Sequence, residues 1–247
     1  RSRPSVDAFR CPGWSEGRNE RVIQCVLFDL FGTLVEYTHG RTDQNFEATH
    51  RFVREAGVDV AYDEMVQAMD QIFVGLEASS RASEREFSMQ DAMRAFLLQR
   101  DKAPDELLED ELSARYVRDW MQNVVVPTGL SPYLKAMGKR YRLGIITNTH
   151  YRPMIDELVA AMGGPALFEV IVTSVEHGRP KPHPDIFHHA LSAMGTTPSE
   201  TVYVGDSFDA DYRGATGVGM GCYLIGRHAR VPVRRQVPSV FDLPSRL

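Results

Sequence analysis

Short apolar runs that stop at a polar residue recur along the chain from residue 22 onward. The first run, VIQCVLF, ends directly before Asp29, and the turn-forming residues Gly32 and Thr33 follow it. Later segments repeat this plan, with helical stretches between them: 141–148, 168–174, 201–207 and 219–226. Because strands that alternate with helices are typical of parallel sheets, we predict an α/β fold with a Rossmann-like parallel-sheet core.

Between residues 37 and 125 the apolar residues change to a helical period. They recur at steps of three and four residues in three stretches, 65–76, 89–97 and 108–120. We expect Ser88 to cap a helix, and Gly57 and Pro104 to separate helices. The methionine and aromatic stripes are interpreted as the core of a helical bundle rather than as a ligand site.

These patterns divide the chain into three parts. Residues 1–21 contain prolines, glycines and many charges, so we predict a flexible tail. Residues 22–36 and 126–247 are predicted to form the Rossmann-like core domain, and residues 37–125 a helical cap domain inserted into it.

The composition of the chain limits which kinds of binding partner are expected. A formal net charge of −5 disfavours nucleic acid, because binding to a phosphate backbone usually needs a basic surface. No apolar run approaches the roughly 18 residues that read as a membrane span, so no membrane partner is expected. The 3 cysteines are too scattered for a disulfide framework or a zinc site, which favours a cytoplasmic location. The oligomeric state stays open.

Carboxylates follow two of the predicted strands. Asp29 ends the first strand, and the segment GDSFDAD places Asp206 and Asp211 at and beyond the end of a later one. In a parallel sheet these strand ends meet at one edge, where ligands bind. Converging carboxylates repel one another unless a cation or a proton intervenes, and Mg²⁺ prefers oxygen ligands and bridges to phosphate oxygens. We therefore expect Mg²⁺ at this edge of the sheet.

Two further polar sites end or follow strands. Lys181 lies in GRPKPHPDIF, where the flanking prolines stiffen the loop, and Thr147 and Asn148 end the segment GIITN. Taken alone, the lysine could be a solvated loop charge and the other two a turn cap. A hydroxyl beside backbone N–H groups can also hold a phosphoryl oxygen.

Together, in this order and on these strands, the residues resemble the four sequence motifs of the haloacid dehalogenase (HAD) superfamily, in its members with a small helical cap. The resemblance covers nearly the whole chain from Val22 onward. It implies a hydrolase in which Asp29 is the nucleophile, Thr147 and Asn148 form the second motif and Lys181 is the third-motif lysine. Asp206 then matches a metal ligand, and Asp211 matches the acidic residue that supports the metal site or the lysine.

One position departs from the family's phosphatases. They carry a second Asp two residues after the nucleophile, which protonates the leaving group, and here that residue is Phe31. Its backbone carbonyl can still ligate Mg²⁺, but its side chain cannot transfer a proton, a step usually worth about 10²–10⁴-fold in rate. His150, beside the second motif, is a candidate substitute acid.

Three functions stay open at this point. The resemblance favours a magnesium-dependent phosphatase that acts on a small, phosphorylated substrate through an aspartyl-phosphate, because Asp206 is retained. A metal-independent 2-haloacid dehalogenase is the second, supported by the aromatic Phe31 and by Arg41, which could hold a carboxylate. The third is a weak or inactive HAD-like binding protein, which Phe31 alone supports. The substrate cannot be read from the sequence, and His39, Arg41 and Asn45 are the nearest cap candidates to contact it.

Overall fold

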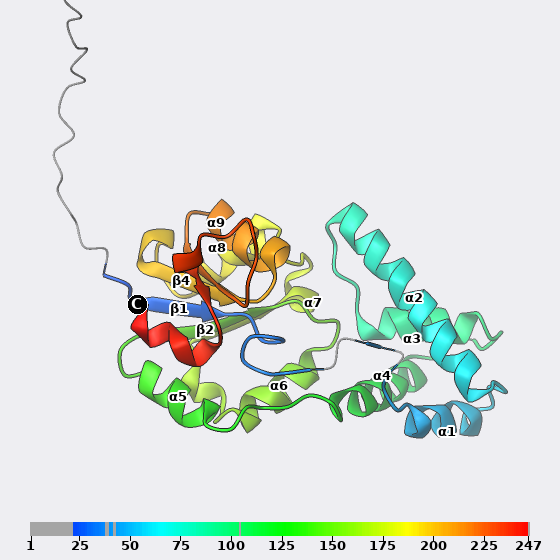
Figure 1. The fold of residues 1–247 in the computed structure, drawn as a ribbon. Coiled ribbons are helices and arrows are strands. Elements are labelled where there is room, and N and C mark those ends of the chain that lie inside the picture. The colour runs from blue at the N-terminus through cyan, green and yellow to red at the C-terminus, as the bar shows by residue number, and fades with distance from the viewer. Residues whose placement is uncertain (1–21, 38–39, 42, 104, 247) are drawn as a thin grey trace, which may run out of the picture.

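The computed structural model describes residues 22–37, 40–41, 43–103 and 105–246. The predicted tail, residues 1–21, lies outside the described residues, as do His39 and Pro104. Within those ranges, 6 parallel strands form one sheet in the order β3-β2-β1-β4-β5-β6 (Figure 1). The strands are β1 (Cys25–Phe28), β2 (Arg142–Thr147), β3 (Val170–Thr173), β4 (Thr201–Gly205), β5 (Gly221–Ile225) and β6 (Gln236–Val237). The predicted parallel-sheet core is confirmed, and only β6 lies in a segment whose sequence signal was weak.

The first strand lies at the centre of the sheet. β1 pairs with β2 on one side and with β4 on the other, so Phe28 lies beside Ile145 and Val204. All four of its residues are buried, as expected for an apolar strand covered on both faces. Strand order reverses between β1 and β4, and a ligand cleft forms beyond the carboxyl ends of strands at such a point.

Helices cover both faces of the sheet. α5 (Leu130–Met137) and α6 (Arg152–Ala161) lie on one face, and α8 (Pro184–Ala193) and α9 (Gly214–Gly217) lie on the other (Figure 1). Alternate residues of β1 point to different cores, with Phe28 packed in the cluster that includes α5 and α6, and Leu27 in the cluster that includes α8. The short segments are α7 (Ser174–His177), η1 (Pro165–Leu167), η2 (Pro198–Glu200), η3 (Phe208–Arg213), η4 (Val233–Arg235) and η5 (Val240–Ser245).

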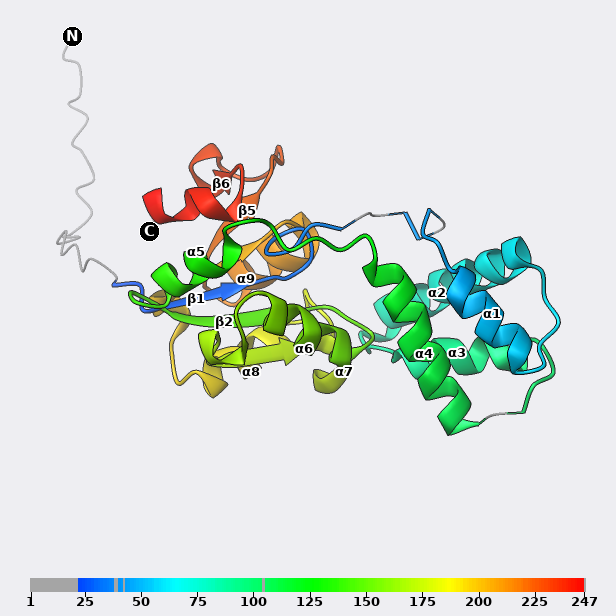
Figure 2. The ribbon, with the colours of Figure 1, turned by 90° about the horizontal axis from the view of Figure 1, so that it is seen from below.

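The helices between β1 and α5 form a second lobe beside the sheet, which Figures 1 and 2 both show. In the described part of the chain they are α1 (Glu47–Glu55), α2 (Tyr62–Ser83), α3 (Met89–Leu98) and α4 (Glu106–Met121). Glu36 and Val125 exchange two backbone hydrogen bonds, of 2.9 and 2.8 Å, where the chain leaves the core and returns to it. This bridge lies next to the predicted boundaries at residues 37 and 125, and the division into two domains stays our interpretation.

The helical stripes form most of the core of this lobe. Met65, Met69 and Phe96 are fully buried, and Ser88 caps α3 through a reciprocal pair with Asp91, as the sequence indicated. The stripes also contribute to a cavity: Met89, Tyr116 and Trp120 line it. The interpretation of the stripes as bundle core alone was therefore incomplete, because periodicity identifies a buried face without saying what it faces.

Two further properties concern the chain as a whole. Cys25 and Cys222 are free and buried. No helix in the described ranges is long and apolar enough to cross a membrane. The cytoplasmic location stays a prediction.

Candidate active site

Asp29 and Lys181 meet in a buried ion pair at the carboxyl end of β1. The backbone N–H of Asp29 donates to the carbonyl of Val204 at 2.8 Å, which fixes the residue at the sheet edge. The Lys181 ammonium lies 2.6 Å from Asp29 Oδ1, and both side chains are almost fully buried. Lys181 is therefore not the solvated loop charge that its sequence context also permitted.

Asp211 and Tyr203 complete the surroundings of the lysine. Asp211 Oδ1 accepts hydrogen bonds from Lys181 Nζ at 2.7 Å and from the Tyr203 hydroxyl at 3.0 Å. Asp211 Oδ2 accepts from the backbone N–H of Ser207 at 2.9 Å. Lys181 also donates to the Tyr203 hydroxyl at 2.9 Å, so its three donors have three partners.

Burial and charge act against each other on this ion pair. Burial raises the pKa of Asp29 to about 7; Lys181 opposes the rise, while Asp211 and Asp206 add to it. Burial alone would lower the pKa of Lys181, but Asp211 and Asp29 outweigh it and raise that pKa to about 12. The lysine is thus held cationic, and the nearby positive charge helps keep Asp29 ionised.

Asn148 contacts the lysine's backbone and not the carboxylates. Its Oδ1 accepts from the Lys181 N–H at 2.8 Å, and its Nδ2 donates to the Lys181 carbonyl at 3.0 Å. This two-point contact fixes the proline-flanked loop and so aims the ammonium at Asp29. Thr147, fully buried at the end of β2, directs its hydroxyl to the Asn148 carbonyl over a long 3.5 Å.

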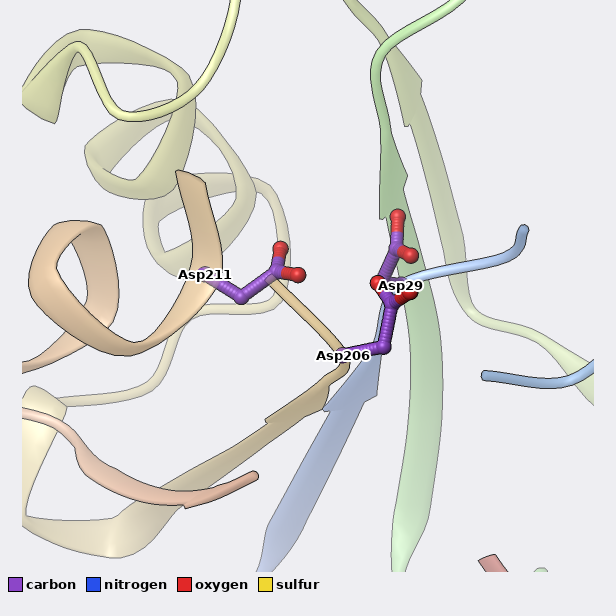
Figure 3. Close-up of side chains that lie close together, drawn as sticks. All are labelled: Asp29, Asp206 and Asp211. Atoms are coloured by element: carbon purple, nitrogen blue, oxygen red, sulfur yellow. The ribbon is translucent and has the colours of Figure 1, made fainter. Parts of the chain in front are cut away.

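Asp206 brings a further carboxylate to the same edge, from the end of β4. Asp29, Asp206 and Asp211 each offer a carboxylate oxygen, and these atoms lie within 4.8 Å of one another (Figure 3). Gly32 has φ +79°, and a Cβ there would lie 2.2 Å from Asp206 Oδ2, so only glycine lets the turn after β1 approach this carboxylate.

This group of oxygens fits Mg²⁺, which prefers carboxylate ligands and retains several waters. Both oxygens of Asp211 already accept hydrogen bonds from Lys181, Tyr203 or Ser207. Asp211 therefore supports the lysine, and Asp29 likewise accepts from Lys181 Nζ at 2.6 Å and from the Thr33 hydroxyl at 3.4 Å. The sequence had left the role of Asp211 between support of the metal site and support of the lysine.

Phe31 lies in an aromatic group with Tyr37 and with Trp120 of α4 in the cap lobe. It makes edge contacts with Tyr37 and Trp120, at centroid separations of 5.7 and 5.5 Å. Together with cap residues it lines a cavity of about 240 Å³ that also reaches Asn148. The aromatic side chains of the lining are Phe31, Tyr37, Phe73, Tyr116, Trp120 and Tyr151.

Arg41 and His150 both line this cavity, and both are already partnered. Arg41 forms ion pairs with Asp70 at 3.3 Å and with Glu77 at 2.6 Å. His150 Nδ1 lies 3.1 Å from a carboxylate oxygen of Glu86.

The other two cap candidates are not placed at the cavity. Asn45 accepts a hydrogen bond from the Glu47 N–H at 3.0 Å and is not part of the described cavity lining, so its described role is at the start of α1. His39 lies outside the described residues.

Sequence reasoning missed two groups. The sequence did contain a signal for Tyr203. It is a hydroxyl-bearing residue in the middle of a buried strand, where such a group needs a hydrogen-bond partner. Glu86 carried no signal, because its buried pairing with His150 depends on where the cap contacts the core.

Residues 23–219 match the family model described as haloacid dehalogenase-like hydrolase. The chain belongs to this family. It is therefore a hydrolase of the HAD superfamily, as the motifs implied.

Individual relatives share parts of the chain. The bovine haloacid dehalogenase-like hydrolase domain-containing protein 3 is 34% identical over 47% of this chain and 47% of its own length. The chain thus spans about half the length of the first curated relatives it matches. The glyceraldehyde 3-phosphate phosphatase of Methanocaldococcus jannaschii is 29% identical over 81% of this chain and 83% of its own. The mouse N-acylneuraminate-9-phosphatase is 29% identical over 51% and 54%.

Solved structures share the HAD fold. A 2-haloacid dehalogenase from Pseudomonas syringae pv. Tomato matches with a TM-score of 0.69 and 22% identity, over 91% of this chain and 97% of that one. A HAD phosphatase from Thermococcus onnurineus matches with a TM-score of 0.59 and 23% identity, over 90% and 97%. At these identities the likeness concerns the fold, and it does not distinguish a phosphatase from a dehalogenase.

Proposed function

We propose that this hydrolase is a magnesium-dependent phosphatase that acts on a small phosphate monoester through an aspartyl-phosphate at Asp29. The observation that carries the proposal is the convergence of Asp206 with Asp29, whose carboxylate oxygens lie within 4.8 Å of each other. Without a cation, a second carboxylate there would oppose attack on an anionic substrate. The phosphatase names of two of the relatives agree with this chemistry.

In the first step, an oxygen of Asp29 attacks the phosphorus, and the bond from phosphorus to the ester oxygen breaks with its electron pair passing to that oxygen. Lys181, held cationic by Asp211, stabilises the negative charge on the transferring group. Bound between Asp29 and Asp206, with the Phe31 carbonyl as a third ligand, Mg²⁺ would supply charge neutralisation and alignment of the phosphorus for in-line attack.

In the second step, water attacks the phosphorus and breaks its bond to Asp29. The carboxylate is restored, and the water's protons leave with the phosphate and the solvent. We assign the binding of a phosphoryl oxygen to Thr147, whose hydroxyl would have to exchange its long contact with the Asn148 carbonyl for the substrate.

The leaving oxygen must gain a proton without help from position 31. His150 is the candidate donor from this chain, because it lines the cavity beyond Phe31 while Glu86 holds its Nδ1. This carboxylate–imidazole contact fixes the orientation of the ring. Where the leaving oxygen is that of an acidic phenol, departure needs no donor.

The alternative chemistry is 2-haloacid dehalogenation, in which Asp29 attacks carbon and halide leaves. Phe31 favours it. Arg41, the cation that would hold the acid's carboxylate, is instead paired with Asp70 and Glu77, which weakens this alternative.

The deciding experiment measures phosphate and halide release from a panel of phosphate esters and 2-haloacids, with EDTA and after restoring Mg²⁺. The esters include glyceraldehyde 3-phosphate and an N-acylneuraminate 9-phosphate. We expect phosphate release that EDTA abolishes and Mg²⁺ restores, and we expect Asp206→Ala to behave like chelation.

Asp209→Asn is the matched control, since Asp209 lies three residues further on and pairs with Arg213 on the surface. It should leave activity unchanged. Halide release that resists EDTA would replace the phosphatase with the dehalogenase, and no steady turnover of any substrate would favour the HAD-like binding protein.

A further inference from the structure

Tyr116, in the wall of the cavity between core and cap, has a buried hydroxyl without a partner among the described residues. Tyr116, on α4, lines the cavity and is 3% exposed, and its hydroxyl makes no hydrogen bond with any residue that the structure describes. Its ring is fixed by stacking on Phe46 and Phe73, at centroid separations of 4.4 and 5.5 Å. Leaving a buried hydroxyl unpaired costs about 1–3 kcal/mol, so a ligand that supplied the missing partner would recover that free energy.

The protonation state of Tyr116 determines the kind of partner. Burial raises the pKa of this phenol, with a smaller opposing effect from Arg41. The hydroxyl therefore stays protonated at neutral pH, and the group that satisfies it best is a hydrogen-bond acceptor.

The charges around the cavity disfavour an anionic ligand. Arg41 is the one described basic side chain of the lining besides His150, and it already pairs with two carboxylates, Asp70 and Glu77. His150 pairs with Glu86, whose side chain is 3% exposed. An anionic group would have to compete with Asp70 and Glu77 for Arg41, and it would lie near the Glu86 carboxylate.

The remaining walls are apolar and aromatic. Phe31 and Trp120 meet edge to face at 5.5 Å, and Phe73 lies beneath the Arg41 guanidinium at 4.3 Å. Such walls favour flat, apolar groups. The volume of about 240 Å³ is below the roughly 300–1,000 Å³ of pockets for drug-sized ligands, so the cavity suits a group with a single ring.

We propose that the leaving group of the substrate is a compact, uncharged ring that carries a hydrogen-bond acceptor, held by the aromatic walls and by a hydrogen bond from Tyr116. Tyr116 is then a specificity-determining residue. This inference rests on the proposed phosphatase function and on the position of Phe31 and Asn148, which place the cavity beside Asp29 and Lys181.

The first test compares four esters of primary alcohols with Mg²⁺ present: benzyl, 4-acetylbenzyl, 4-carboxybenzyl and propyl phosphate. The three benzyl esters have leaving alcohols of similar acidity, so differences among them report on binding. We expect kcat/KM to be highest for the neutral acceptor, 4-acetylbenzyl phosphate, and lower by about tenfold for benzyl phosphate, as one hydrogen bond implies. The carboxylated and propyl esters should be poorer still.

The second test removes the hydroxyl. Tyr116→Phe should lower kcat/KM for 4-acetylbenzyl phosphate to the value for benzyl phosphate, and should leave benzyl phosphate unchanged. Because no hydrogen bond is lost in the free protein, its Tm should stay constant or rise. Tyr62→Phe is the matched control, since the Tyr62 hydroxyl accepts from the Phe46 N–H at 3.0 Å in the cap. That variant should lose Tm and keep the wild-type order of esters.

The third test removes the two carboxylates that pair with Arg41. The double variant Asp70→Asn with Glu77→Gln should raise kcat/KM for 4-carboxybenzyl phosphate relative to benzyl phosphate by about tenfold or more. Asp59→Asn with Glu64→Gln removes the same charge from pairs with Arg54 and Arg100 outside the cavity lining, and should change nothing.

The outcomes separate the two proposals. If no ester releases phosphate, the phosphatase proposal fails. If esters are hydrolysed but the carboxylated or propyl ester matches 4-acetylbenzyl phosphate, or Tyr116→Phe reduces all four equally, the phosphatase stands and the assignment of the leaving group is wrong.

Discussion

The polar groups around Lys181 are bonded to one another, whereas the cavity under the cap contains a hydroxyl that is bonded to none of the described residues. In the core, Lys181 donates to Asp29, Asp211 and Tyr203. In the cap, Tyr116 lies among stacked rings with its hydroxyl unpaired in the described part of the chain. A site whose groups are mutually satisfied is preorganised for one chemistry, and a site with an unsatisfied group is completed by its ligand.

From this difference we expect the two regions to have different functions. The core residues that converge are those the family motifs name, so their chemistry belongs to the family. The cavity is lined by residues of both the core and the cap, and its cap residues lie outside the family motifs. Under the proposed function, these cap residues bind the group attached to the phosphate. Substitutions in the core should therefore reduce the rate for every substrate, and substitutions in the cavity should change the order of substrates.

The largest effect is expected at the nucleophile. Asp29→Asn should reduce turnover of every substrate to less than a few per cent of wild type, because the carboxylate oxygen makes the covalent bond. Steady-state phosphate release checks this. Activity above that level in a clean preparation would remove Asp29 from the nucleophile role.

Stability provides the control that the variant is folded, and its pH dependence has a definite sign. The pKa of Asp29 is raised from about 3.8 to about 7 by burial, so the folded protein keeps the proton over a range where the unfolded chain loses it. The carboxylate therefore destabilises the metal-free protein increasingly as pH rises from about 4 to 7. Asp29→Asn should raise the free energy of unfolding at pH 8 by about 1–4 kcal/mol, at 1.36 kcal/mol per pKa unit, and by little near pH 4. Equal effects at both pH values would contradict this account.

A smaller but still large effect is expected at the lysine. Lys181→Ala should lower kcat by about 10²-fold, because it removes a fixed charge from a site that excludes water. It should also lower Tm, since Asp29 and Asp211 lose their shared cation. Asn148→Ala should lower kcat less, by about tenfold, because the Lys181 ammonium remains and only its orientation toward Asp29 is lost. Lys139→Ala, at an exposed position, is the control, and an unchanged rate in Lys181→Ala would make the lysine purely structural.

The sequence predicted most of the core because its constraints are local. A buried strand that ends in an aspartate, as at Asp29, can be recognised without knowing what surrounds it, and strand ends in a parallel sheet meet at one edge. The meeting of Asp29 and Asp206 follows from those two facts, whereas Lys181 and Asp211 lie in segments beyond the strand ends, whose paths the sequence pattern does not determine.

The cap could be predicted as helices but not as a binding surface. The helical period that includes Tyr116 and Trp120 identifies a buried face of α4. It does not show which part of that face borders a cavity, because this depends on how α4 packs against α2 and the turn after β1. Arg41 illustrates the same limit: its position suggested a carboxylate ligand, and its partners Asp70 and Glu77 on α2 become apparent only in three dimensions. Long-range pairings of this kind leave no periodic pattern in the sequence.

The smallest effect is expected where the two regions meet, at Phe31. The wild-type protein should hydrolyse 4-nitrophenyl phosphate much faster than propyl phosphate, because an acidic phenol departs without a proton and an alcohol does not. Phe31→Asp should narrow this gap by about tenfold, through faster hydrolysis of propyl phosphate. We expect a gain below the usual 10²–10⁴-fold of a positioned acid, because this position is packed around the Phe31 ring.

That substitution also removes the ring contacts with Tyr37 and Trp120, so its effects on packing and on proton transfer must be separated. Phe31→Ala does this, because it loses the same ring without adding an acid. Both variants should lose Tm by similar amounts, and both should bind benzyl phosphate more weakly, since Phe31 is a wall of the cavity. Only Phe31→Asp should accelerate propyl phosphate, and its kcat for that ester should fall at high pH as the carboxyl loses its proton. If Phe31→Ala narrows the gap equally, the wild-type preference comes from the shape of the cavity, and proton supply at position 31 is not what separates the two esters.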